Sequence, residues 1–98
     1  MAYRVIVSPR AQREIEEAID YYAQHSADAP RHFVQSLKDV YQALTNNPFF
    51  RVRYKNIRAV KLRHFPYLLY FIVNERQNTV RLLSCFHGRR NPDDKPMR

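Results

Sequence analysis

The stretch at residues 44–54 reads LTNNPFFRVRY and marks the point where the pattern of the chain changes. Before it, hydrophobic residues recur every three or four positions, which is the spacing of one helix face. After it, hydrophobic and basic residues alternate, as they do along a half-buried strand. The segment Asn46-Asn47-Pro48 stops the helix, because proline lacks a backbone N–H and clashes with the preceding turn. The sequence therefore predicts a helical part followed by a part made of strands.

Two amphipathic helices are predicted before this boundary. The first begins at Ser8-Pro9, where serine can cap free amide groups and proline fits the first helical position. The second begins near Asp28 and Pro30, so a short link joins the two helices into an αα-hairpin. A β-branched run at residues 3–7 predicts a strand ahead of them. The hydrophobic positions of the two helices repeat with one spacing: Ala11, Ile15, Ala18, Ile19 and Tyr22, then Phe33, Leu37, Val40, Tyr41 and Leu44.

Four strands are predicted after the boundary. Residues 50–54 and 60–63 alternate hydrophobic with basic side chains, whereas residues 67–73 are hydrophobic on both faces, as expected of a central strand. A polar loop at 74–78 leads into the last strand at 79–86. The order β-α-α-β-β-β-β predicts an α+β fold, with the αα-hairpin packed on one face of an antiparallel sheet. Residues 1–98 form a single domain in this reading, with a polar tail at 91–98.

Basic residues are concentrated in the second half of the chain. The 98 residues include 17 Lys and Arg and 9 Asp and Glu, a formal net charge of +8. Residues 49–98 contain twelve basic and three acidic side chains, a net charge of +9, whereas residues 1–48 are close to neutral. Such a charge favours a polyanion or an acidic protein as partner. We expect Arg51, Arg53, Lys61 and Arg63 to form a basic face opposite the helices, with Tyr54, Phe65 and Tyr67 available to stack on bases.

Composition excludes several classes of protein. A hydrophobic fraction of 45% argues against disorder, and the longest hydrophobic run, at residues 67–73, is too short to cross a membrane. No signal peptide is predicted at the N-terminus. The single cysteine, Cys85, excludes an internal disulfide and a cysteine-based zinc site, and the single glycine excludes a glycine-rich phosphate loop. We therefore expect a cytoplasmic protein without metal or cofactor.

The segment His87-Gly88-Arg89-Arg90 is the first candidate for chemistry. A histidine can move a proton near neutral pH, and two arginines can hold a phosphate and stabilise developing negative charge. This set would suit attack of an RNA 2′-hydroxyl on the adjacent phosphate. The alternative is a structural histidine beside arginines that form salt bridges. The acidic residues of the first helix are expected on a solvated helix face rather than in a site. They are Glu14, Glu16, Glu17 and Asp20.

The ordered motifs resemble RelE/ParE toxins of type II toxin–antitoxin systems. A strand ending in Ser-Pro, a helical hairpin ending in Asn-Pro, Lys61-Leu62-Arg63, Pro66-Tyr67 and a final strand that runs into residues 87–92, HGRRNP, follow one another in the sequence. The similarity extends from Tyr3 to Pro92 and is greatest to the ParE-like branch. It implies a growth-inhibiting toxin of the kind used in plasmid stabilization, held in a hetero-oligomer by a cognate antitoxin. The basic charge predicts that this antitoxin is acidic.

The resemblance leaves two targets open. RelE-like toxins are ribosome-dependent mRNA endonucleases (mRNA interferases), and ParE-like toxins inhibit DNA gyrase without a nuclease activity. If the chain is RelE-like, the resemblance implies Arg63, His87 and Arg89 as the catalytic set. In either case the expected target-binding residues are Arg51, Arg53, Lys61, Arg63, Arg89 and Arg90.

Two departures from the nuclease pattern favour gyrase. Leu68 follows Tyr67 at a position that often carries arginine, and no tyrosine follows Tyr70. We therefore expect a ParE-like gyrase inhibitor. A RelE-like endonuclease and an inactive basic module that binds nucleic acid remain the alternatives.

Overall fold

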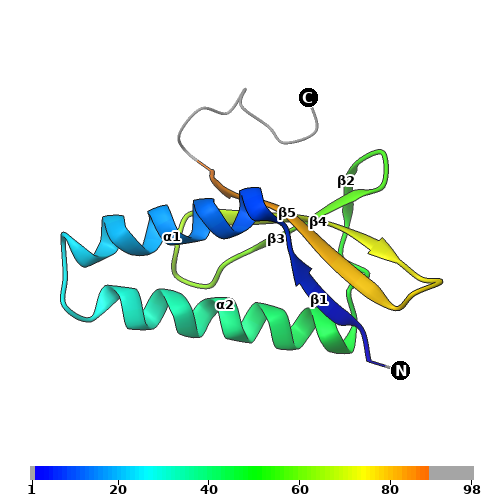
Figure 1. The fold of residues 1–98 in the computed structure, drawn as a ribbon, viewed down its shortest axis with the longest axis horizontal. Helices are drawn as coiled ribbons and strands as arrows, with labels where there is room; N and C mark the ends of the chain where they lie inside the picture. Colours follow the sequence, from blue (N-terminus) through cyan, green and yellow to red (C-terminus); the bar gives the residue numbers. More distant parts are fainter. Residues whose placement is uncertain (1, 89–98) are drawn as a thin grey trace.

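The computed structural model describes residues 2–88, and its order of elements is the predicted one (Figure 1). The chain forms a strand, a helical hairpin and a four-stranded meander. The elements are β1 (Arg4–Val7), α1 (Pro9–Ala23), α2 (Ala29–Asn46), β2 (Val52–Tyr54), β3 (Ile57–Lys61), β4 (Tyr67–Asn74) and β5 (Thr79–His87). The predicted α+β fold is confirmed.

The strands form one sheet in the order β1-β5-β4-β3-β2. The meander from β2 to β5 is antiparallel, as expected. The first strand differs, because β1 runs parallel to β5, with Arg4 opposite Thr79 and Val7 opposite Leu82. A parallel neighbour needs a long connection, and here the helical hairpin and the first three strands of the meander supply it. The sheet is therefore mixed.

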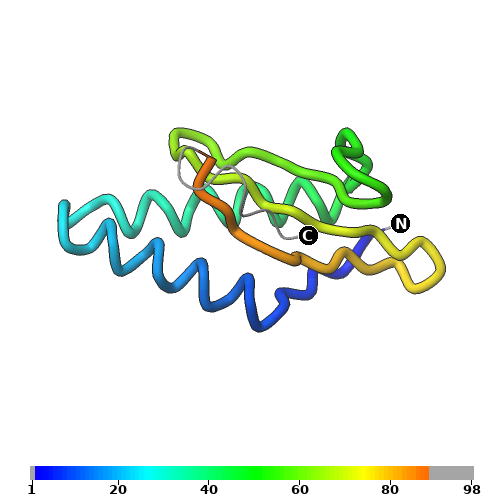
Figure 2. The backbone as a smooth tube through the Cα atoms, turned by 90° about the horizontal axis from the view of Figure 1, so that it is seen from above, coloured from blue at the N-terminus to red at the C-terminus, as the bar shows by residue number. Residues whose placement is uncertain are grey.

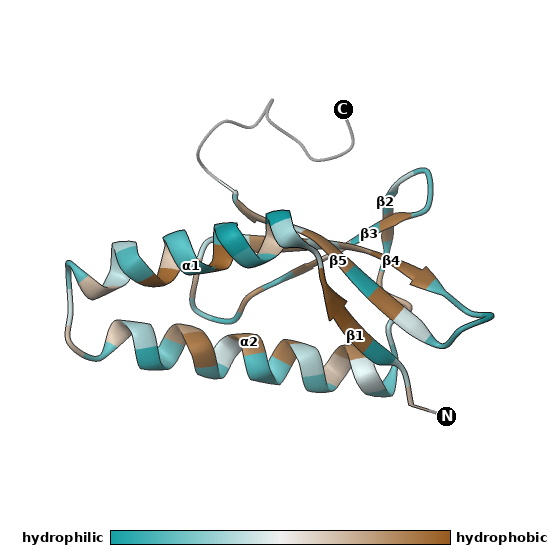
Figure 3. Cartoon of the chain, viewed as in Figure 1, coloured by the Kyte–Doolittle hydropathy of each residue, from teal (hydrophilic) through white to brown (hydrophobic). Residues whose placement is uncertain are grey.

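Both helices pack on the same face of the sheet. Ile15, Phe33 and Leu44 from the helices join Leu69 and Leu82 from the central strands in one buried core. Figure 3 shows the alternation of hydrophobic and hydrophilic residues along both helices, with the hydrophobic stripe of each turned to this core. The turn of the hairpin extends beyond the end of the sheet in Figures 1 and 2.

The predicted helix starts are found, with one difference in capping. The Ser8 hydroxyl accepts a hydrogen bond from the Ala11 N–H at 3.1 Å, and Pro9 is the first residue of α1. Asp28 occupies the position before α2, but its side chain makes no capping hydrogen bond. The hydroxyl of Ser26 accepts the N–H of Ala29 at 3.2 Å in its place. The short link between the helices therefore provides its own cap.

The outer face of the sheet, away from the helices, is hydrophobic at its centre, so the expected basic face is wrong there. Side chains alternate across β4, and Leu68, Tyr70 and Ile72 point to this outer side. They form a second hydrophobic cluster with Ile57, Ala59, Leu83 and Phe86. The four cations are distributed around the cluster instead: Arg51 and Arg53 at the edge strand β2, Lys61 at the end of β3, and Arg63 in the following loop.

Glu14 points to the sheet, whereas the sequence placed it on a solvated helix face. One oxygen of its carboxylate accepts the Ser84 hydroxyl at 2.8 Å and the Cys85 N–H at 2.9 Å. The other oxygen lies 3.3 Å from Nε of Arg10. Since β1 ends opposite Leu82, this carboxylate satisfies the edge of β5 beyond the last paired residue.

Cys85 is buried, and its thiol ionises with difficulty. Burial, and after it the negative charge of Glu14, raises the pKa of Cys85 to about 12. Burial, with a smaller contribution from Cys85, also raises the pKa of Tyr41 to about 12. Both groups are therefore neutral in the folded protein at physiological pH.

We expect Glu14→Ala to lower the free energy of unfolding by about 2–3 kcal/mol, because hydrogen bonds to a charged group contribute about 1.5–3 kcal/mol. Urea denaturation measures this change. Glu17→Ala, at an exposed position of the same helix, is the matched control and should change stability by less than about 0.5 kcal/mol. Equal losses in the two variants would show that Glu14 does not stabilise β5.

Stability should fall as pH rises from about 9 toward 12. In this range Cys85 and Tyr41 lose protons in the unfolded chain but keep them in the fold, whose pKa values are raised to about 12. The unfolded state then binds fewer protons than the folded state, so the free energy of unfolding decreases with pH. Urea denaturation at several pH values measures the slope, and Cys85→Ala should make it shallower. An unchanged slope in that variant would contradict the assignment to Cys85.

Candidate functional site

The loop at residues 62–66, between β3 and β4, is held on three sides. Its first residue, Leu62, donates its N–H to the carbonyl of Tyr67 at 2.9 Å. On the β5 side the Gly88 N–H donates to the carbonyl of Pro66 at 2.8 Å. On the α2 side the Ser36 hydroxyl donates to the carbonyl of Arg63 at 2.9 Å. The backbone of this loop is therefore fixed relative to both the sheet and the helices.

Phe65 anchors the same loop in the helical hairpin. Its ring lies 5.1 Å from the ring of Tyr22 in α1 and 5.1 Å from that of Phe33 in α2, both in edge-to-face geometry. Tyr67 completes the cluster at 5.5 Å from Phe33. Pairs of this geometry add about 0.5–1.5 kcal/mol each beyond the hydrophobic area that they bury. The loop is thus part of the core on one side and exposed on the other.

His64 is at the exposed side of the loop with φ of 69°. This left-handed conformation is uncommon for a residue with a side chain, and it costs roughly 1–2 kcal/mol. The anchoring hydrogen bonds and Phe65 hold the loop in this shape. Its effect is to place the imidazole at the surface, where it borders two hollows.

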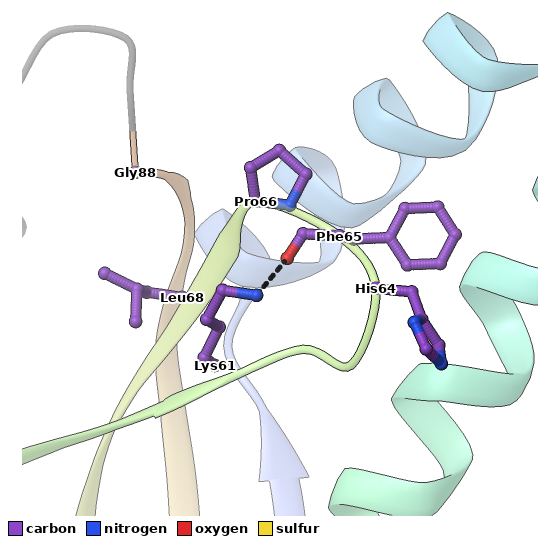
Figure 4. Close-up of a pocket in the computed structure, with 6 residues that line it drawn as sticks. All are labelled: Lys61, His64, Phe65, Pro66, Leu68 and Gly88. Carbon is purple, nitrogen blue, oxygen red and sulfur yellow. Dashed lines mark hydrogen bonds between the residues drawn. The ribbon is translucent and has the colours of Figure 1, made fainter.

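The first hollow, of about 490 Å³, lies between the loop and the ends of β3, β4 and β5 (Figure 4). Its hydrophobic part comes from Phe65, Pro66 and Leu68. The ammonium of Lys61 donates to the carbonyl of Phe65 at 3.2 Å and to that of Leu62 at 3.3 Å, which keeps a positive charge at the rim. Such a combination suits a ligand with an apolar part and an adjacent negative charge.

The second hollow, of about 350 Å³, lies between the loop and α2. Arg63 and His64 border it from the loop, and His32 and Asp39 border it from the helix. Asp39 accepts a hydrogen bond from the Gln35 amide at 3.0 Å. Lys61 and Arg63 therefore flank the loop on its two sides rather than converging on one point.

His87 lies on the helix side of the sheet, away from Lys61. The register places it opposite Tyr67, and the two rings meet edge to face at 5.0 Å. Arg89 and Arg90 fall outside the described residues. Arg51 and Arg53 lie at the β2 edge, which pairs with Arg58 and Ile57 at the opposite end of β3 from Lys61. The structure therefore groups Lys61 and Arg63 around one loop and separates Arg51 and Arg53 from them.

The aromatic residues expected to stack on bases have different roles. Tyr67 is only 3% exposed, and Phe65 is partly buried and packs against the core while its remaining surface lines the two hollows. Sequence reasoning did not assign His64, Pro66 and Leu68, which line the first hollow, to a site. The signal for this loop in the sequence is Pro66, which follows Lys61 and Arg63 and ends their strand pattern.

Residues 2–88 contain no group of three or more His, Cys, Asp or Glu side chains placed to hold a metal ion. Within the same residues no helix has the length and hydropathy required to span a bilayer.

A comparison with models of protein families identifies the family of this chain. The family model of the ParE toxin of the type II toxin–antitoxin system, parDE, matches residues 5–92. Comparison with curated protein sequences gives no match.

Three solved structures share the fold. A mutant of the Escherichia coli toxin RelE in the free state aligns with a TM-score of 0.67 at 19% identity, over 94% of this chain and 90% of that one. The chromosomal ParDE system from P. aeruginosa gives 0.65 at 14% identity, over 88% and 96%. The RelBE2 toxin–antitoxin complex from Mycobacterium tuberculosis gives 0.63 at 17% identity, over 89% and 99%. With the match of the family model over nearly the whole sequence, the chain belongs to the ParE toxin family of type II toxin–antitoxin systems.

Proposed function

We propose that this toxin arrests growth by binding DNA gyrase, without breaking a bond itself, and that an acidic cognate antitoxin neutralises it in the cytoplasm. The feature that carries the proposal is the first hollow beside the 62–66 loop. It combines a hydrophobic floor with the fixed ammonium of Lys61, as a protein-binding surface does. The match to the ParE family model agrees with this choice of target.

The arrangement of the expected catalytic residues also supports binding rather than catalysis. A general base has to reach the proton that it removes, within about 3 Å or through one water. His87 packs against the buried ring of Tyr67 on the helix side, whereas Arg63 borders the hollow between the loop and α2. These two residues therefore do not face a shared cavity in the described part of the chain.

An antitoxin partner agrees with the charge of the toxin and with its relatives. Two of the similar structures are described as toxin–antitoxin systems, RelBE2 and ParDE. The excess of cations in residues 49–98 favours an acidic partner, which would approach faster and lose affinity in salt.

The purified protein should inhibit supercoiling by purified gyrase and cause cleaved DNA complexes to accumulate. Lys61→Glu should raise the concentration needed for half-inhibition about tenfold, the equivalent of about 1.4 kcal/mol, because it reverses the charge at the rim of the hollow. Lys38→Glu, an equal change of charge at an exposed position of α2, is the control and should have little effect. Normal supercoiling at a large excess of the wild-type protein would refute the proposal.

Ribosome-dependent cleavage of mRNA is the second candidate, because Lys61 and Arg63 leave two cations beside one loop. With programmed ribosomes we expect the mRNA to stay intact. Cleavage in the A-site codon, reduced about 10²–10³-fold by Arg63→Ala, would assign the endonuclease activity to this loop instead. A protein without effect in either assay would be an inactive binding module.

A further inference from the structure

The second hollow, between α2 and the 62–66 loop, brings together nitrogen-bearing side chains from two different elements. Its volume of about 350 Å³ is at the lower end of the range for small-ligand pockets, about 300–1,000 Å³. Arg63 and His64 border it from the loop, and His32 borders it from α2. All three side chains are exposed, and none of them forms a hydrogen bond or an ion pair with another described residue. Their N–H groups are therefore available to a ligand.

The backbone of His64 holds its side chain toward this hollow. Its φ of 69° is uncommon for a residue with a side chain. Figure 4 shows the imidazole pointing from the loop toward α2. The Ser36 hydroxyl, which donates to the Arg63 carbonyl at 2.9 Å, and the ring of Phe65 against Phe33 fix the loop on either side of it. Unfavourable backbone conformations cluster at binding and catalytic sites, so this one indicates a function for the imidazole.

The helix side of the hollow adds a fixed acceptor. His32, Ser36 and Asp39 follow the spacing i, i+4, i+7, so they lie on one face of α2. With a rise of about 1.5 Å per residue, His32 and Asp39 are about 10 Å apart along the helix axis. The Gln35 amide donates to the Asp39 carboxylate at 3.0 Å and holds it in place. The hollow therefore offers donors together with one separate carboxylate.

This combination fits a phosphomonoester of about the size of a nucleotide. A terminal phosphate carries nearly two negative charges at neutral pH, and a guanidinium such as that of Arg63 binds it through two parallel hydrogen bonds. Imidazoles supply further donors, and their charge when protonated adds to the attraction. Asp39 repels a second phosphate but accepts hydrogen bonds from hydroxyl groups, such as those of a sugar. Phe65 provides a hydrophobic wall for the remainder of the ligand.

We propose that the second hollow binds a small phosphomonoester, with its phosphate on Arg63, His32 and His64 and one of its hydroxyl groups donating to Asp39. The two hollows share His64 and Phe65 but differ in their cations. The first has Lys61, to which we assign gyrase binding. The phosphomonoester site is therefore separate and does not depend on the choice of target.

Adenosine 5′-monophosphate serves as the probe, and NMR titration of the backbone amides follows its binding to the full-length protein. We expect a dissociation constant below about 1 mM, with the largest shifts at residues 36, 63 and 64. Inorganic phosphate should compete with the probe, whereas adenosine, which lacks the phosphate, should not bind. Arg63→Gln should weaken binding about tenfold or more, because it removes the charged, two-pronged donor. Arg53→Gln makes the same change at the β2 edge and should bind like the wild type.

His64→Asn tests the imidazole separately, because asparagine tolerates a positive φ and should retain the shape of the loop. The wild type should bind the probe about threefold or more tightly at about pH 6.5 than at about pH 8, since a histidine gains a proton in this range. The other charged groups that face the hollow, Arg63 from the loop and Asp39 from α2, are of types that do not titrate there. His64→Asn should bind more weakly at the lower pH and show a smaller change between the two values.

Circular dichroism of each variant verifies that the fold is retained. No binding of the probe, equal binding of adenosine, equal affinity of Arg63→Gln and Arg53→Gln, or an affinity that does not change with pH would each overturn the proposal. Tighter binding at this hollow of a short RNA with a 5′-hydroxyl end would also overturn it, because that strand has phosphodiesters and no terminal phosphate. The gyrase assay with Lys61→Glu is independent of all these outcomes.

Discussion

The edge of β5 that faces β1 is the feature on which the rest of the structure depends, because its backbone groups need partners along their whole length. β1 supplies them as far as Leu82, and the Ser8 N–H extends the pairing by donating to the Leu82 carbonyl at 3.1 Å. Where the chain leaves β1 and enters α1, the Glu14 carboxylate accepts hydrogen bonds from the Ser84 hydroxyl and the Cys85 N–H. One junction therefore satisfies the sheet edge and orients the first helix on it.

The placement of α1 then determines the surface at the other end of the sheet. Because α1 packs on β5, Tyr22 near its end contacts Phe33 of α2, and both rings contact Phe65 from the β3–β4 connection. The Ser36 hydroxyl holds the neighbouring Arg63 carbonyl. The cations on either side of the loop are presented by a rigid support, although they themselves are exposed. A chain of this size can therefore hold the surface that we propose for target binding in a defined shape.

Because the outer face of the sheet is hydrophobic at its centre, the basic residues do not form one continuous surface. A uniformly basic sheet would suggest a surface that attracts any polyanion. Here the cations surround Leu68, Tyr70 and Ile72 or lie at the β2 edge beside exposed hydrophobic groups. Each positive region therefore has its own hydrophobic neighbour, which favours protein partners that bring both acidic and aliphatic groups.

Local signals in the sequence determined the elements of this protein. Ser8-Pro9, the helical spacing, the stop at Asn46-Asn47-Pro48 and the alternation after it are interactions between near neighbours, so they can be interpreted without knowing the fold. Which side chains point to the core and which strands pair with each other could not be assigned in this way. The inward direction of Glu14, the parallel pairing of β1 with β5, the burial of Tyr67 and the separation of Arg51 and Arg53 from Lys61 all depend on segments that are distant in sequence. Only the tertiary structure decided them, because strand register and helix placement fix which groups are left without a partner and which side chains can supply one.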